Sequence, residues 1–76
     1  MTPWVRVAYH HDPADLSPVW LAVSRTQPSE GWRAAFRDTL ADGTRVVQIR
    51  ASVGRGERVW IRDSDGVRRA TEVRRQ

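Results

Sequence analysis

Residues 31–62 read GWRAAFRDTLADGTRVVQIRASVGRGERVWIR, and this stretch decides the fold. Apolar and polar residues alternate along three segments of it, which is typical of half-buried β-strands. Asp42-Gly43 separates the first two segments, and this dipeptide favours a two-residue hairpin turn because it accepts positive φ at both positions. A loop with a glycine at each end, residues 54–56, separates the second segment from the third. The stretch therefore predicts three antiparallel strands.

The two turns also predict which residues face one another. A two-residue turn at 42–43 sets Phe36 opposite Ile49, and the loop at 54–56 sets Ile49 opposite Ile61. Both turns bring apolar side chains to the same face, and such agreement supports the register. The predicted apolar face holds Trp32, Ala34, Phe36, Val47, Ile49, Ala51, Val53, Val59 and Ile61.

The opposite face of the predicted sheet is rich in arginine and has no carboxylate. Its Arg50 lies directly across from Trp60, where a guanidinium group can stack on the indole. Arginines hold phosphates through paired hydrogen bonds and tryptophans stack on bases, so this face is predicted to bind nucleic acid. The predicted binding residues are Arg33, Arg37, Arg50, Arg58, Trp60 and Arg62, with Trp4 and Arg6 as a possible extension of the patch. Trp4 is alternatively a residue that seals a sheet edge.

The remaining segments complete an all-β pattern. Residues 4–9 and 19–24 alternate as strands, and a loop at 26–29 would set Leu21 opposite Ala34. Another turn is expected at residues 63–66, whereas residues 67–76 suit either a strand or a short helix. Turns at this spacing favour a small antiparallel meander that closes into an SH3-like barrel of five or six strands. Residues 1–76 are thereby expected to form one small β domain.

A helix near residues 30–42 is the alternative. Trp32, Phe36 and Leu40 follow helical spacing, Ser29 could cap the N-terminus and Gly43 could end the helix. This reading would make the fold α+β and would remove Arg33 and Arg37 from the basic face.

Composition narrows the function classes. The chain has 76 residues, no cysteine and a net charge of +4, and its thirteen basic residues are all arginine. The lack of lysine and asparagine indicates a high-GC genome, such as an actinobacterial one, which weakens the link between basicity and nucleic acid. Neither a membrane-spanning run nor a signal pattern is found, so a cytoplasmic protein is expected.

No motif of catalysis or metal binding is evident. His10, His11 and Asp12 are adjacent, but neighbouring side chains on an extended chain point apart, so no metal site and no cofactor are predicted. The sequence therefore predicts a small, basic, non-enzymatic module that binds nucleic acid (DNA or RNA) with little sequence readout. The alternative is a protein-interaction module that uses the same face to bind an acidic protein surface or a second copy of itself.

Overall fold

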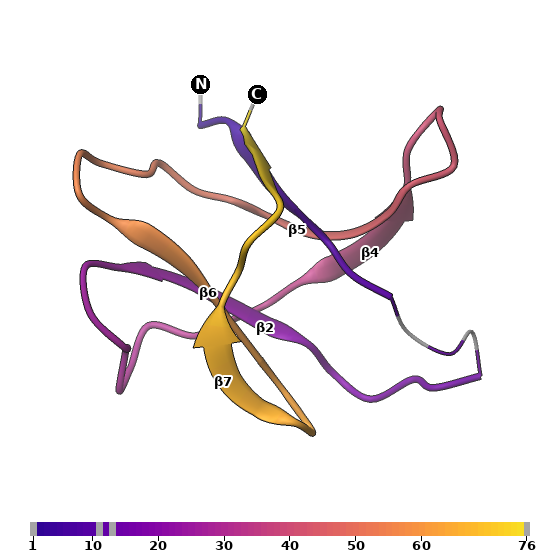
Figure 1. Ribbon diagram of the computed structural model, residues 1–76, viewed down its shortest axis with the longest axis horizontal. Helices are drawn as coiled ribbons and strands as arrows, with labels where there is room; N and C mark the ends of the chain where they lie inside the picture. The colour runs from indigo at the N-terminus through magenta and orange to yellow at the C-terminus, as the bar shows by residue number, and fades with distance from the viewer. Residues whose placement is uncertain (1, 11, 13, 76) are drawn as a thin grey trace.

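The described part of the chain consists of strands and loops (Figure 1), and its strands form two four-stranded antiparallel sheets. The computed structural model describes residues 2–10, 12 and 14–75. One sheet has the order β4-β5-β1-β8, and the second has the order β3-β2-β6-β7. The strands are β1 (Trp4–Ala8), β2 (Trp20–Ser24), β3 (Arg33–Ala34), β4 (Phe36–Thr39), β5 (Arg45–Arg50), β6 (Arg58–Asp63), β7 (Gly66–Arg69) and β8 (Val73–Arg75).

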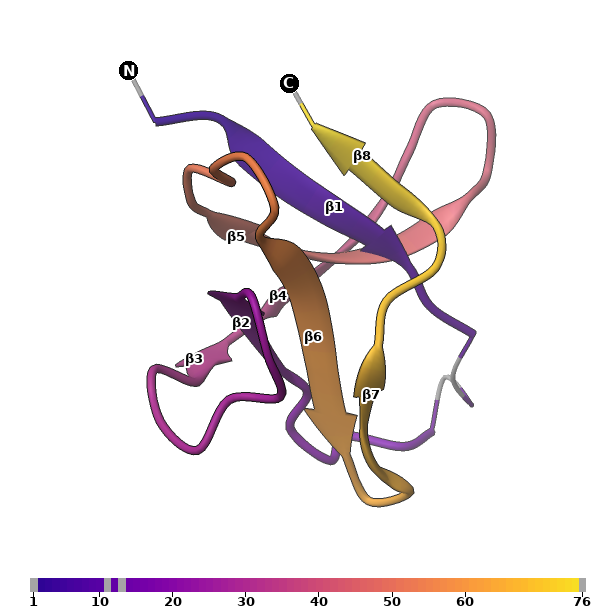
Figure 2. The ribbon, with the colours of Figure 1, turned by 60° about the vertical axis from the view of Figure 1, so that its left-hand side comes forward.

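The inner faces of the two sheets meet in one apolar core. Figure 2 shows β1, β5 and β8 in the upper part of the molecule and β2, β6 and β7 below them. Alternation along each strand sends every second side chain inward. Both sheets contribute to the buried cluster, which consists of Val5, Val7, Val19, Leu21, Val47, Ile49, Val59 and Ile61.

The sheets are joined by the chain at both edges but do not close into a barrel. β3 and β4 are separated only by Ala35, whose N–H donates to the carbonyl of Val19 at 2.9 Å. β7 and β8 follow one another at the other edges of the two sheets. The all-β prediction is confirmed, but eight strands in two sheets take the place of the five- or six-stranded barrel. The helix near residues 30–42 was a wrong alternative, because β3 and β4 occupy that stretch.

The hairpin between β4 and β5 has a longer loop than the two-residue turn predicted. Gly43, with φ of +89°, takes the left-handed position, and its N–H donates to the Leu40 carbonyl at 2.9 Å. The extra loop residue shifts the pairing by one, so that Phe36 lies opposite Gln48 instead of Ile49. A one-residue shift in pairing moves every side chain of a strand to the opposite face of the sheet. Phe36, predicted in the core, is therefore 65% exposed.

The pairing of β2 with β3 is shifted in the same way. Trp20 pairs with Ala34, where the sequence predicted Leu21. Arg33 consequently lies opposite Leu21 instead of opposite an outward residue. The shift also moves Trp32 out of the predicted apolar face.

The turn at residues 54–57 is present, but it joins two sheets instead of two paired strands. The Glu57 N–H donates to the Gly54 carbonyl at 3.0 Å, as expected for a tight turn. Ile49 of β5, however, pairs with Val5 of β1, and Ile61 of β6 pairs with Leu21 of β2. The predicted pairing of Ile49 with Ile61 is wrong.

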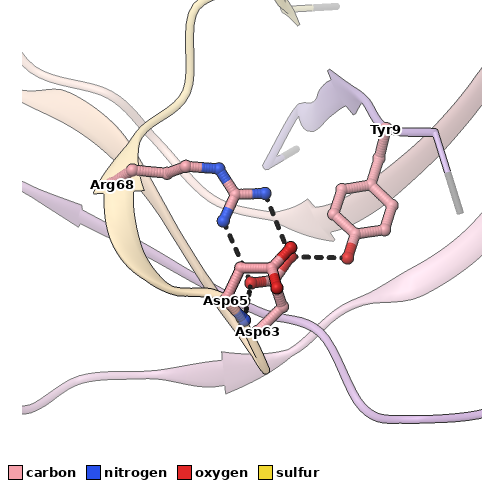
Figure 3. A network of polar contacts seen from close by, with 4 residues as sticks. All are labelled: Tyr9, Asp63, Asp65 and Arg68. Carbon is pink, nitrogen blue, oxygen red and sulfur yellow. Dashed lines mark hydrogen bonds and ion pairs between the residues drawn. The ribbon is translucent and has the colours of Figure 1, made fainter.

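A polar network ties the end of β1 to the hairpin between β6 and β7 (Figure 3). The Tyr9 hydroxyl donates to Asp63 Oδ2 at 2.6 Å, and Arg68 donates to both carboxylate oxygens at 3.0 Å. The Asp65 N–H donates to Asp63 Oδ1 at 2.8 Å. The Asp63 side chain is only 5% exposed, so these four donors take the place of water as hydrogen-bond partners of its carboxylate oxygens. The network therefore connects the two sheets outside the apolar core.

The segment after residue 65 forms two strands where the sequence left strand and helix open. Strands predicted at residues 4–9 and 19–24 correspond to β1 and β2, and residues 66–75 contain β7 and β8. Within the described ranges, no helix has the length and apolar character needed to cross a membrane.

Candidate functional site

The outer face of the second sheet gathers three tryptophans and three arginines. Val59 and Ile61 point into the core, so their neighbours on β6 point away from it. Trp60 pairs with Ala22 of β2 and with Arg69 of β7. We define the tryptophan face by the residues Trp20, Trp32, Trp60, Arg58, Arg62 and Arg69.

Arg62 lies among two of these indoles. It pairs directly with Trp20, and its Cζ lies 5.1 Å from the Trp20 ring centroid and 5.0 Å from that of Trp32. Both distances fall within the range of cation–π attraction. Arg62, which the sequence predicted to bind phosphate, therefore contacts the rings of both Trp20 and Trp32.

Trp60 is half-buried and lies over β2. Its Nε1–H donates to the Ser24 carbonyl at 3.0 Å. Ala22, directly opposite Trp60, is on the outer side of the sheet and yet only 2% exposed. The indole is therefore held in one orientation and keeps part of its surface accessible.

Two exposed arginines are neighbours of Trp60 on this face. Arg58 precedes it by two residues on the same face of β6, and Arg69 lies opposite it on β7. Within residues 2–10, 12 and 14–75, neither guanidinium makes a side-chain hydrogen bond or an ion pair. Both line a hollow of about 150 Å³ that does not include Trp60 and whose apolar walls are Val53, Val59, Ala70 and Val73. Glu57 also lines it, but its Oε1 accepts the Gly54 N–H at 2.8 Å.

The outer face of the first sheet carries the other half of the predicted patch. Arg50 lies opposite Trp4, with its Cζ 4.6 Å from the ring centroid, so the predicted pairing of Arg50 with Trp60 is wrong. Arg6 lies opposite Gln48 and donates from Nε to its Oε1 at 2.9 Å. We define the first-sheet face by the residues Trp4, Arg6, Phe36 and Arg50.

Two predicted binding residues, Arg33 and Arg37, lie on neither outer face. Arg33 donates to the Arg50 carbonyl at the corner between the sheets. Arg37 donates to the carbonyls of Asp15 at 2.7 Å and Ser17 at 2.6 Å, and it thereby holds the loop that follows β1. Both changes follow from the one-residue shifts, which point these side chains away from the outer faces.

Sequence reasoning missed three members of the tryptophan face. Trp20 was not among the predicted binding residues, although its alternation with Val19 and Leu21 points it outward. Trp32 was assigned to the core through the shifted register. Arg69 lay in a segment whose structure was left open, and only the strand reading would have paired it with Trp60.

Comparison with family models, with curated proteins and with solved structures finds no match for this chain. Its function has to be inferred from the two outer faces themselves. Among the residues that the structure describes, no group of three or more His, Cys, Asp and Glu side chains could hold a metal ion. His11 lies outside the described residues.

Proposed function

We propose that the protein is a small non-enzymatic module that binds nucleic acid through the tryptophan face. The observation that carries the proposal is a half-buried indole, Trp60, with two exposed arginines as neighbours on the same face, Arg58 on its own strand and Arg69 opposite it on β7. A stacking surface with cations next to it suits a base whose neighbouring phosphates contact those cations. Sequence readout is expected to be weak because backbone charge and base stacking dominate such contacts.

The charges on this face support an anionic partner. The described strand residues that point outward with Trp60 include three arginines and no carboxylate. Like charges on neighbouring strands repel one another, and a bound polyanion relieves that repulsion. Each exposed arginine that neutralises a phosphate should also make the affinity depend on salt.

Single strands should bind better than duplexes. A base can stack on an indole only when it is not already stacked between two neighbours, and the bases of a duplex are. Because Arg62 contacts the rings of Trp20 and Trp32, Trp60 is the residue that we assign to stacking.

The test is a fluorescence-anisotropy titration of labelled single-stranded and duplex oligonucleotides at several salt concentrations. Trp60→Ala should weaken single-strand binding by about 1–3 kcal/mol, and Trp60→Phe should retain most of the affinity because it keeps an aromatic ring. Arg58→Gln and Arg69→Gln should each reduce the salt slope by about one. Arg45→Gln removes the same charge from an exposed residue of the first sheet and serves as the matched control.

Two results would contradict the proposal. One is an affinity that does not change with salt, because counterion release would then be absent. The other is a loss of affinity in Arg45→Gln equal to that in Arg58→Gln, because binding would then depend on total charge and not on this face.

A protein partner is the second candidate, supported by the same cluster of tryptophan and arginine, which are frequent anchors of protein interfaces. An acidic protein surface fits better than a second copy. A symmetric dimer through this face would place arginines against arginines. Sedimentation velocity of the protein alone tests self-association, and Trp60→Ala should shift the equilibrium if a dimer forms there.

A further inference from the structure

The two outer faces of the molecule carry the same kind of residues. The tryptophan face belongs to the second sheet, and the first-sheet face contains Trp4, Arg6, Phe36 and Arg50. One core lies between the sheets, so the two faces point away from each other. A single flat ligand cannot cover both.

The first-sheet face repeats the elements of the tryptophan face. Arg50 is exposed and stacks over Trp4, with 4.6 Å from its Cζ to the ring centroid. Phe36 lies one strand away on the same side, and 65% of it is exposed. The Arg6 guanidinium is oriented by Gln48, which is only 9% exposed although it lies on the outer side of its sheet. An aromatic ring open to solvent thus lies beside oriented cations here too.

We propose that this face is a second site for single-stranded nucleic acid, so that one molecule holds two strand segments at once and bridges them. This inference rests on the function proposed above for the tryptophan face. It adds a second ligand and a stoichiometry of two, and it would make the protein a strand-bridging or strand-annealing module.

The second site should be the weaker of the two. Asp38 lies on the outer side of the first sheet next to Phe36, where its Oδ2 accepts from Gln48 at 3.5 Å. Asp42 lies beyond it, 3.7 Å from Arg74. These carboxylates oppose phosphates at one end of the face and confine favourable contacts to the end that contains Trp4 and Arg50. The tryptophan face is therefore expected to fill first.

The experiment counts oligonucleotides on each protein molecule. The probe is oligothymidylate of about six nucleotides, near the lower end of the ~4–16 nucleotides that small single-strand-binding folds cover. Isothermal titration calorimetry at low salt should give two sites. A second assay mixes donor-labelled and acceptor-labelled probes and measures energy transfer, while sedimentation velocity shows whether the bridged complex contains one protein molecule.

Two double variants separate the faces. Arg50→Gln with Phe36→Ser alters exposed residues of the first-sheet face, and Arg58→Gln with Arg69→Gln alters the tryptophan face. The first-sheet variant should lower the stoichiometry from two oligonucleotides per protein to one and reduce energy transfer at least about 10-fold. The affinity of its stronger site should change less than about 2-fold. The tryptophan-face variant should remove the stronger site and keep the weaker one. Thermal unfolding of each variant verifies that it folds.

The results also separate this inference from the function on which it rests. The unaltered protein could bind only one oligonucleotide, at a site that the tryptophan-face variant removes and the first-sheet variant leaves unchanged. That result would overturn the proposed second site and support the first. Two sites that both persist in the first-sheet variant would overturn this inference as well. No binding by the unaltered protein at low salt would overturn both.

Discussion

Replacement of Asp63 by asparagine tests whether the polar network in Figure 3 stabilises the contact between the sheets. Asparagine has nearly the same shape, but it lacks the negative charge and replaces one acceptor oxygen with an amide donor. Four donors from Tyr9, Arg68 and Asp65 point at the Asp63 carboxylate, so at least one of them would then face another donor. The variant should fold, but with a lower free energy of unfolding.

The size of the loss follows from burial. Removal of one partner from a fully buried ion pair costs about 3–5 kcal/mol. The Asp63 side chain is 5% exposed, but that of Arg68 is 46% exposed, so water can replace part of what Arg68 loses. We therefore expect Asp63→Asn to cost about 2–3 kcal/mol, which for a domain of this size lowers Tm by roughly 10–20 °C.

The same residue should produce an acid limb in stability. Hydrogen bonds from Arg68, and then from Tyr9 and the Asp65 N–H, hold the pKa of Asp63 well below its usual range, against the opposing effect of burial. A carboxyl whose pKa is lower in the folded state contributes stability above its unfolded pKa of about 3.9 and loses it as pH falls further. The unaltered protein should therefore lose stability below about pH 4, and Asp63→Asn should lose less.

The measurement is urea unfolding followed by tryptophan fluorescence between pH 2 and pH 7. Arg68→Met and the double variant complete a mutant cycle, in which the two losses should be clearly less than additive. If Asp63→Asn changes the free energy of unfolding by under about 0.5 kcal/mol at neutral pH and leaves the loss of stability at acid pH unchanged, the claim that this carboxylate links the sheets is refuted.

Three further predictions concern the single residues Tyr9, Gly43 and Arg62. Burial and the Asp63 carboxylate raise the pKa of Tyr9 to about 12. In an alkaline titration the unaltered protein should therefore lose stability between about pH 10 and pH 12. Tyr9→Phe should show no such loss. Gly43→Ala should lower the free energy of unfolding by about 1 kcal/mol because φ is +89° there, although no atom would obstruct the new Cβ. An unchanged midpoint of urea unfolding would contradict this backbone strain. Arg62→Leu should cost about 1 kcal/mol and shift tryptophan emission because two indoles lose their cation, and unchanged emission would show that the contact does not order them.

Within single strands, the sequence predicted the direction of most side chains correctly. Val5, Val47, Ile49, Val59 and Ile61 are buried, as their alternation indicated. Trp60, which alternates with the last two, points outward, as predicted. This part succeeds because inward and outward positions depend only on local alternation.

Pairing between strands was predicted less well, because it depends on backbone geometry that the residue types leave open. Asp42-Gly43 suits a two-residue turn, but Gly43 with positive φ also completes a loop that contains one residue more. The second solution exposes Phe36 and puts Arg37 on the opposite side, against the loop that follows β1. The sequence offered no local signal to choose between them.

Partners that are far apart in the chain were beyond local reasoning. The loop at residues 54–56 was interpreted as a hairpin, because consecutive strands often pair. β1 instead takes the place beside β5, and β6 pairs with β2. The predicted arginine patch therefore divides between two sheets, with Arg50 beside Trp4 on one and Arg58 and Arg62 beside Trp60 on the other.

The position of β1 between β5 and β8 has a consequence for biosynthesis. Val5 pairs with Ile49 on one side and with Arg75 on the other, so β1 has partners that are translated much later than β1 itself. A nascent chain stalled before β5 emerges would carry an unpaired apolar strand, and such strands bind chaperones or one another. The order β5-β1-β8 can therefore be completed only after β8 has left the exit tunnel, and until then at least one edge of β1 stays unpaired.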